Sequence, residues 1–220
     1  MRGYKLIILE GDFMNHFGRY LLLSCTLMLA LSIPLQLFAQ RGGGGPSRFS
    51  AGVYGLFGTG KMGNGGSNDP GFALDRNMLY TSVGLFAGIS LKKFRVGLNY
   101  EYMMAGQQTE PAEVANTNMS GTGGNVGLRL EYYDGTNAIG AVVHLADTYK
   151  LDKTTFAGDS AEYKGGPAKG FSVQYMRRIK NKIGIILDYT TGEYNESLTT
   201  GPVKWNRMGL GIVFSNFAGK

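Results

Sequence analysis

The 220-residue chain contains little of the chemistry on which metal proteins and many enzymes depend. It has one cysteine, Cys25, and two histidines, and no cluster of metal-ligating residues is evident in the sequence. Cys25 lies in an N-terminal apolar segment that we expect to be cleaved, so the mature chain would hold no cysteine and, of the histidines, only His144. This composition fits export without disulfides. We expect neither a metal nor a cofactor.

The sequence also lacks a concentrated basic surface. It has 22 basic and 16 acidic residues, for a formal net charge of +6. Removing residues 1–40 takes away three basic and two acidic residues and leaves 19 and 14. These charges are spread over turns, loops and one strand face, whereas nucleic-acid binding requires them to be clustered. We therefore expect no nucleic-acid partner.

The N-terminus is typical of a secretory signal peptide. Arg19 precedes the apolar run 20–38, which ends in Ala39-Gln40 before the sequence changes to RGGGGPS. A positive start, an apolar core and a small residue at the boundary define such a signal. We predict a signal peptide over residues 1–40, with Met14 as a second candidate start, and a flexible linker over 41–47.

A transmembrane helix is the alternative for this run, because about 20 apolar residues span a bilayer. Pro34 and the glycine-rich exit favour cleavage instead. After residue 40 no segment is apolar enough to form a membrane helix.

Alternation of apolar and polar residues organises the rest of the chain. From Leu79 to Leu91 the apolar residues occupy odd positions, and from Phe94 to Tyr102 they occupy even positions. A two-residue turn at Lys92-Lys93 pairs Leu91 with Phe94, so the change of parity keeps one apolar surface continuous. This pattern predicts a long β-hairpin with one apolar face and one face of glycine and charge.

The same alternation predicts eight strands in all. We expect them at about residues 49–58, 79–91, 94–103, 125–133, 139–146, 171–176, 183–190 and 207–214. Short turns fall at 92–93, 134–137 and 180–182, the last pairing Ile179 with Ile183, and long loops at about 59–77, 105–123, 151–169 and 194–203. Strict alternation of short turns and long loops, with an even strand count, is typical of transmembrane β-barrels. The predicted fold is all-β, an eight-stranded antiparallel up-and-down transmembrane β-barrel over residues 48–217.

Alternation alone does not say which face points outward, and a lipocalin-like soluble barrel would hold the apolar face inside around a small ligand. An eight-stranded barrel has little interior space, and the bulky residues lie on the apolar face, opposite glycine, serine and asparagine. Charges of both signs on the polar face can pair in a narrow lumen, whereas an arginine in hydrocarbon costs about 2–4 kcal/mol near the midplane. We therefore predict a lumen charge network of Arg95, Glu101, Arg129, Glu131, His144, Asp188 and Arg207.

Aromatic residues on the apolar face form two groups, at the levels expected of the girdles that flank a bilayer. The group near the short turns is Phe49, Phe94, Tyr132 and Phe214. The group near the long loops is Phe57, Tyr100, Tyr102, Phe171 and Tyr189.

Taken together, residues 48–217 resemble the small eight-stranded outer-membrane barrels of the OmpA and OmpX type. The last predicted strand, RMGLGIVF, resembles the outer-membrane insertion signal at Arg207, Gly209, Ile212 and Phe214, although the chain continues to Lys220 instead of ending on an aromatic residue. The resemblance implies a bacterial outer membrane as the location and outer-membrane lipid and lipopolysaccharide as the surroundings. It also implies the outer-membrane assembly machinery as a partner, and surface ligands or host molecules as partners of the loops. We expect a barrel without a periplasmic domain.

The resemblance also admits enzymes that modify lipid A, so we sought a catalytic set. His144, Ser172 and Asp188 share the polar face of neighbouring predicted strands, as a triad would. Residues facing the lumen cannot easily meet a lipid in the leaflet, so we expect no enzyme and no catalytic residues. The arginines and carboxylates have two interpretations, a plug that fills the lumen or a gate that opens a thin water path, and small barrels normally fill with side chains.

The sequence thus predicts a structural, adhesive or surface-interaction role through four long extracellular loops. The first alternative is a narrow pore or carrier of small solutes. A lipid-modifying enzyme and a soluble lipocalin-like binder are further alternatives.

Overall fold

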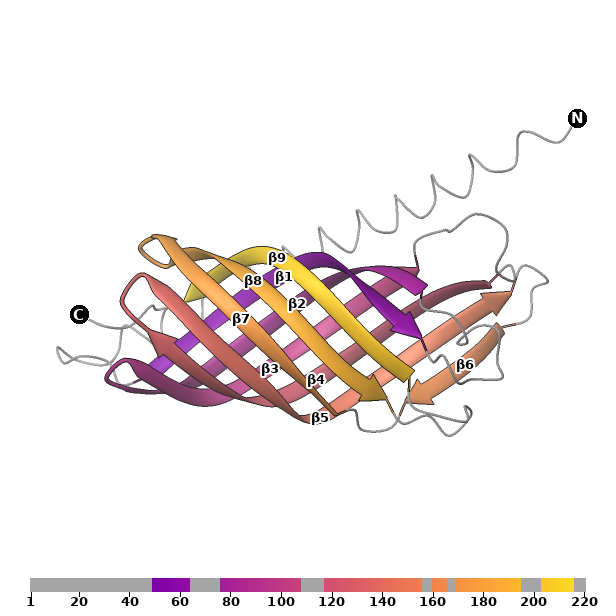
Figure 1. Cartoon of the computed structure of the whole chain (residues 1–220), viewed down its shortest axis with the longest axis horizontal. Coiled ribbons are helices and arrows are strands. Elements are labelled where there is room, and N and C mark those ends of the chain that lie inside the picture. Colours follow the sequence, from indigo (N-terminus) through magenta and orange to yellow (C-terminus); the bar gives the residue numbers. More distant parts are fainter. Residues whose placement is uncertain are drawn as a thin grey trace, which may run out of the picture.

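The computed structural model (Figure 1) describes residues 49–63, 76–107, 117–155, 160–165, 169–194 and 203–215. The predicted signal peptide and linker lie outside these residues. None of the described residues belongs to a helix long and apolar enough to cross a membrane.

All described elements are strands of one antiparallel sheet. They are β1 (Phe49–Gly63), β2 (Arg76–Leu91), β3 (Phe94–Gln107), β4 (Thr117–Tyr133), β5 (Asn137–Thr155), β6 (Ser160–Gly165), β7 (Lys169–Lys180), β8 (Ile183–Tyr194) and β9 (Val203–Ser215). The order is β4-β3-β2-β1-β9-β8-β7-β5-β6, and the additional pairing of β4 with β5 closes the sheet on itself. Only β6 stands outside the ring, because it pairs with β5 alone. The predicted eight-stranded antiparallel up-and-down barrel is therefore confirmed.

Three short connections cluster at one end of the barrel, which we call the turn end; the opposite end is the loop end (Figure 1). Leu91 pairs with Phe94 as predicted, and Lys92 adopts a positive φ of 59° in the two-residue turn between them. The third turn differs from the prediction. Lys180, not Ile179, pairs with Ile183, and Ile179 is the extra residue of a β-bulge.

The second turn is closed by Asp134. Its carboxylate accepts hydrogen bonds from the backbone N–H of Asn137 at 2.7 Å and of Thr136 at 2.9 Å. These bonds favour the charged form, so the pKa of Asp134 lies below its ordinary value. A short acidic residue that binds the backbone ahead of it is typical of tight turns.

Several strands are longer at the loop end than the alternation predicts. β3 continues to Gln107, β4 begins at Thr117 and β5 runs to Thr155, where β6 extends the sheet by one more strand. The predicted loops 59–77, 105–123 and 151–169 were therefore too long. Alternation reveals a strand only where one face is apolar, and ladder hydrogen bonds continue beyond that point without leaving such a signal.

The apolar face points outward, as predicted, and this excludes the lipocalin-like arrangement. Large apolar side chains exposed on the barrel surface include Leu85, Ile89, Leu98, Leu128, Leu130, Ile139, Val143, Leu187, Leu210 and Ile212. Charged residues of the outward face lie at the ends, with Lys61, Glu193 and Lys204 at the loop end and Arg177 at the turn end. An apolar belt between two charged rims is what a bilayer requires of a barrel.

A bulge in β5 changes one detail of this pattern. The β4–β5 register shifts between Val126 and Gly127, because Val126 pairs with Ala146 while Gly127 pairs with His144. Leu145 is therefore the extra residue, and both Leu145 and Ala146 are exposed. Uninterrupted alternation over the predicted strand 139–146 would place Ala146 in the lumen together with His144, and this expectation is wrong because the bulge turns Ala146 outward.

Candidate functional site in the barrel lumen

The lumen holds all seven residues of the predicted charge network. Each lies on the inward face of its strand with a small exposed fraction, namely Arg95, Glu101, Arg129, Glu131, His144, Asp188 and Arg207. Burying a charged side chain costs free energy unless an opposite charge pairs with it. The ion pairs among these residues therefore decide whether the lumen is stable as a filled interior.

One ionic cluster, the turn-end cluster, consists of Arg95, Arg129 and Glu131. Arg95 Nη1 lies 2.6 Å from Glu131 Oε1, and Arg129 donates to Glu131 Oε2 through Nη2 at 2.7 Å and Nε at 3.0 Å. The Arg95 guanidinium stacks over the Tyr133 ring at 3.8 Å, and that of Arg129 lies over Phe86 at 4.4 Å. Two arginines share one carboxylate, so the cluster carries a net charge of +1.

The second, the loop-end cluster, consists of Arg207, Glu101 and Asp188. Arg207 Nη2 lies 2.7 Å from a Glu101 carboxylate oxygen, and Arg207 Nε lies 3.8 Å from Asp188 Oδ2. The guanidinium is also within 4.9 Å of the Tyr80 ring. Here two carboxylates share one arginine, so this cluster carries a net charge of −1 with both carboxylates ionised.

Neutral side chains join the two clusters. Gln174 accepts a short hydrogen bond from Arg129 and donates to Asp188 at 2.9 Å. Asn99 accepts from the same Arg129 nitrogen at 3.3 Å and donates to the Tyr54 hydroxyl at 3.0 Å, and that hydroxyl lies 3.5 Å from Glu101. The opposite charges of the clusters cancel, and the bonds between them span the interior from strand to strand.

The three residues of the hypothetical triad lie near one another but are not arranged as one. His144 Nε2 is 3.1 Å from Ser172 Oγ, but Asp188 reaches Ser172 only through Thr190, whose hydroxyl is 2.7 Å from Asp188 and 2.8 Å from Ser172. Asp188 accepts hydrogen bonds from Gln174 and Thr190. In a catalytic triad the carboxylate instead accepts from the imidazole and so orients the histidine toward the serine.

The interior also contains large side chains that the sequence did not identify. We expected bulk only on the apolar face, and this was wrong, because the lumen also buries Tyr54, Tyr80, Phe86, Tyr133, Met176, Ile186 and Trp205. Inward-facing glycines make room for them: a Cβ added to Gly84 would overlap the Tyr54 ring, and one added to Gly209 would overlap the Tyr80 hydroxyl. The sequence did carry a signal for these side chains, because aromatic residues occupy some of the strand positions that otherwise hold glycine and polar residues.

The residues of the predicted insertion signal and of the aromatic girdles lie on the faces of their strands that alternation predicts. In the proposed insertion signal, Arg207 and Gly209 face the lumen, whereas Ile212 and Phe214 face outward. Eight of the nine predicted girdle residues are exposed on the outer surface, namely Phe49, Phe57, Phe94, Tyr100, Tyr102, Tyr132, Phe171 and Tyr189, and Phe214 is half-buried. Phe94 and Tyr132 pack edge to face with ring centroids 5.5 Å apart.

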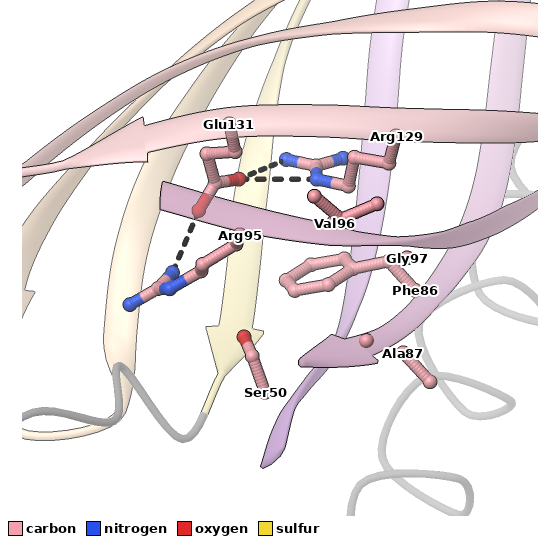
Figure 2. Close-up of a pocket in the computed structure, with 9 residues that line it drawn as sticks. Ser50, Phe86, Ala87, Arg95, Val96, Gly97, Arg129 and Glu131 are labelled. Carbon is pink, nitrogen blue, oxygen red and sulfur yellow. Dashed lines mark hydrogen bonds and ion pairs between the residues drawn. The ribbon is translucent and has the colours of Figure 1, made fainter. Parts of the chain in front are cut away.

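A small pocket opens beside the turn-end cluster. Its walls come from Ser50, from residues 86–88 and 95–97, and from Arg129 and Glu131. Figure 2 shows the Ser50 hydroxyl turned toward the Arg95 side chain, with Phe86 on the opposite side. The hollow has room for about one water molecule. Within the described part of the chain, no three His, Cys, Asp or Glu side chains are grouped so that they could hold a metal ion.

A closed ring of eight antiparallel strands, apolar outside and ionic inside, is the fold of the small outer-membrane β-barrels, and this chain adopts it. Among solved structures it is similar to Neisserial surface protein A (NspA), with a TM-score of 0.53 and 10% identity over 78% of this chain and 99% of that chain. It is also similar to Ail, the attachment invasion locus protein of Yersinia pestis, with a TM-score of 0.52 and 11% identity over 76% of this chain and 99% of that one. No family profile matches the sequence, and no curated protein matches it either. At such low identity these likenesses concern the fold alone.

Proposed function

We propose that this protein resides in a bacterial outer membrane as a plugged barrel that presents its loop end for contacts at the cell surface. The observation that carries the proposal is the continuous network across the lumen, from Arg95 through Glu131, Arg129 and Gln174 to Asp188 and Arg207. A small barrel that is filled with side chains leaves no aqueous channel. We therefore assign this lumen a supporting role and not a role in transport.

The length of the strands supports a role at the loop end. A tilted strand needs about 9–11 residues to cross a bilayer, whereas β4 has 17 residues and β5 has 19. The surplus lies at the loop end, where β6 adds to the sheet beyond the apolar belt (Figure 1). One protein of similar fold, Ail, is described as an attachment invasion locus protein and was solved with a heparin analogue. Attachment is therefore a role that this fold can serve.

Labelling of single cysteines tests the location and orientation. Cys25, the only natural cysteine, lies in the predicted signal peptide, so Lys61→Cys and Lys180→Cys each introduce one thiol into the mature chain. Both lysines are exposed, Lys61 at the loop end and Lys180 at the turn end. We expect a membrane-impermeant maleimide to label only Lys61→Cys on intact cells and both variants after lysis. Labelling of Lys180→Cys alone on intact cells would reverse the orientation, and labelling of neither would contradict surface placement.

A narrow pore is the second candidate function, and planar bilayers separate it from a plug. We expect the wild-type protein to give no discrete conductance steps, because the turn-end and loop-end clusters block the lumen. The triple variant Tyr54→Ala, Arg129→Ala, Gln174→Ala removes both bridges between the clusters and should conduct. Steps from the wild type that change in Arg95→Ala would instead support a gate formed by the turn-end cluster.

A further inference from the structure

The turn end of the barrel carries an excess of accessible positive charge. Its described side chains that are not buried include one acidic residue, Asp134, and six basic residues, namely Lys92, Lys93, Arg177, Arg178, Lys180 and Lys182. The Asp134 carboxylate is already engaged: it accepts from the backbone N–H of Asn137 and Thr136, and these bonds lower its pKa together with the nearby charge of Lys93. The four basic residues of the hairpin between β7 and β8 form no ion pair with any described residue.

A β-bulge brings two of these basic residues to the same face of the hairpin. Arg177 pairs with Ile185, and Lys180 pairs with Ile183, because Ile179 is the extra residue of the bulge. Ile183 and Ile185 belong to the outward face of β8, and directly paired residues of neighbouring strands share a face. Uninterrupted alternation would instead turn Lys180 to the lumen side, opposite Arg177. The bulge therefore makes Arg177 and Lys180 successive cations on the outer surface, and both are exposed.

These two cations border the apolar belt. Tyr175 is the outward residue that precedes Arg177 on β7, and it pairs with Ile139, which pairs in turn with Tyr132 of the turn-end aromatic group. Ile179, between the two cations along the chain, is 66% exposed. Long basic side chains at such a border keep their stems on apolar surface and extend their charged ends into the headgroup layer.

The chemistry of this face selects an anionic phospholipid. The planar guanidinium of Arg177 fits a phosphate group through two parallel hydrogen bonds, and the Lys180 ammonium adds a second positive charge. Arg178 and Lys182 raise the charge of the same hairpin, so a headgroup with a net negative charge is favoured over a zwitterionic one. A free phosphate ion would use the cations alone, whereas a phospholipid also places its acyl chains against the exposed isoleucines.

We propose that Arg177 and Lys180 bind the phosphate of an anionic phospholipid in the membrane leaflet at the turn end, with the acyl chains against Ile179 and Ile183. The bound lipid holds the barrel at its depth from the end opposite to the one that makes surface contacts. This inference rests on the proposed membrane location, but neither on the plugged lumen nor on the contacts of the loop end.

Native mass spectrometry tests this site. The protein, purified from membranes in a non-ionic detergent, would be mixed with equal amounts of phosphatidylglycerol and phosphatidylcholine, and the bound lipids counted. We expect the wild type to retain phosphatidylglycerol about 25-fold better, which is about fivefold for each of the two cations. Arg177→Gln with Lys180→Gln should retain both lipids about equally, whereas Arg177→Lys with Lys180→Arg should keep most of the preference.

The matched control is Lys92→Gln with Lys93→Gln, which removes the same charge from another turn at the same end and should keep the preference. All four side chains are exposed, so these variants should fold, and circular dichroism of the β-sheet checks this. Equal retention of the two lipids by the wild type would overturn the proposal. An equal loss in the control would show a general charge effect, and displacement of the lipid by an equal concentration of inorganic phosphate would show a site for the free ion; either result would overturn it as well. Cysteine labelling on cells tests the membrane location separately, so the two failures are distinguishable.

Discussion

Replacement of Arg207 by methionine is expected to lower the free energy of unfolding by about 3–5 kcal/mol, because removing one partner of a buried ion pair leaves uncompensated charge behind. Arg207 is the only cation of the loop-end cluster, and both Glu101 and Asp188 lie against it. Methionine retains apolar volume beside Tyr80 and removes the charge together with the hydrogen bond to Glu101. The two carboxylates would then be buried together without a counter-ion.

The measurement can use Trp205, the only tryptophan of the chain. It is buried in the lumen, and its ring is 5.5 Å from the Arg207 guanidinium. Its fluorescence should therefore follow loss of the interior during urea unfolding in detergent. Refolding in vitro avoids any effect of the substitution on the insertion signal in the cell.

A neutralised variant provides the control for this substitution. Combining Arg207→Met with Glu101→Gln and Asp188→Asn removes all the charge of the loop-end cluster, and we expect most of the lost stability to return. If Arg207→Met alone cost less than about 1 kcal/mol, a typical value for exposed pairs, the loop-end cluster would not be a buried network.

Placing an arginine at Leu98 is expected to destabilise the barrel in lipid by about 2–4 kcal/mol. Leu98 is 57% exposed and pairs with Ala87 and Leu128, in the middle of the apolar belt. On β3 it lies between Phe94 and Tyr102, which belong to the two predicted girdles. A charge at this depth must be carried into hydrocarbon. Unfolding in phospholipid vesicles gives the free-energy difference from the wild type.

The matched variant is Thr59→Arg. Thr59 is exposed on the outer surface of β1, toward the loop end and two residues from Lys61. Arginine there should change stability by less than about 0.5 kcal/mol, as for ordinary surface substitutions. If both arginines were tolerated equally, the belt would face water, and the membrane assignment would fail.

Hydrophobic patterning predicted the parts of this fold that depend on an apolar outer face. The register of the hairpin from Leu79 to Tyr102 followed from a change of parity across Lys92-Lys93, because only one pairing keeps the belt continuous. The same pattern placed the charged residues inside. It could not reveal the bulge at Leu145 or the strand β6, because neither depends on the contrast between an apolar and a polar face.

The sequence could predict only some of the ion pairs, for a different reason. Arg95 and Glu131 are cross-strand neighbours, so their pairing needs only the β3–β4 register. Arg207 and Glu101 come from β9 and β3, which are not adjacent in the sheet. Their contact depends on the width of the closed barrel and on the level of each strand, and alternation carries no information on either.

Closure between β1 and β9 also bears on how the molecule is made. The other barrel interfaces join strands that follow one another along the chain, whereas this one pairs Gly52 with Ser215 and Gly63 with Lys204. Bringing such distant segments together is entropically expensive and slow. Until β9 has been synthesised and exported, β1 and β8 each keep an unpaired edge, which hydrocarbon cannot solvate. Biogenesis should therefore be all-or-none, with each nascent chain shielded until its final strand arrives.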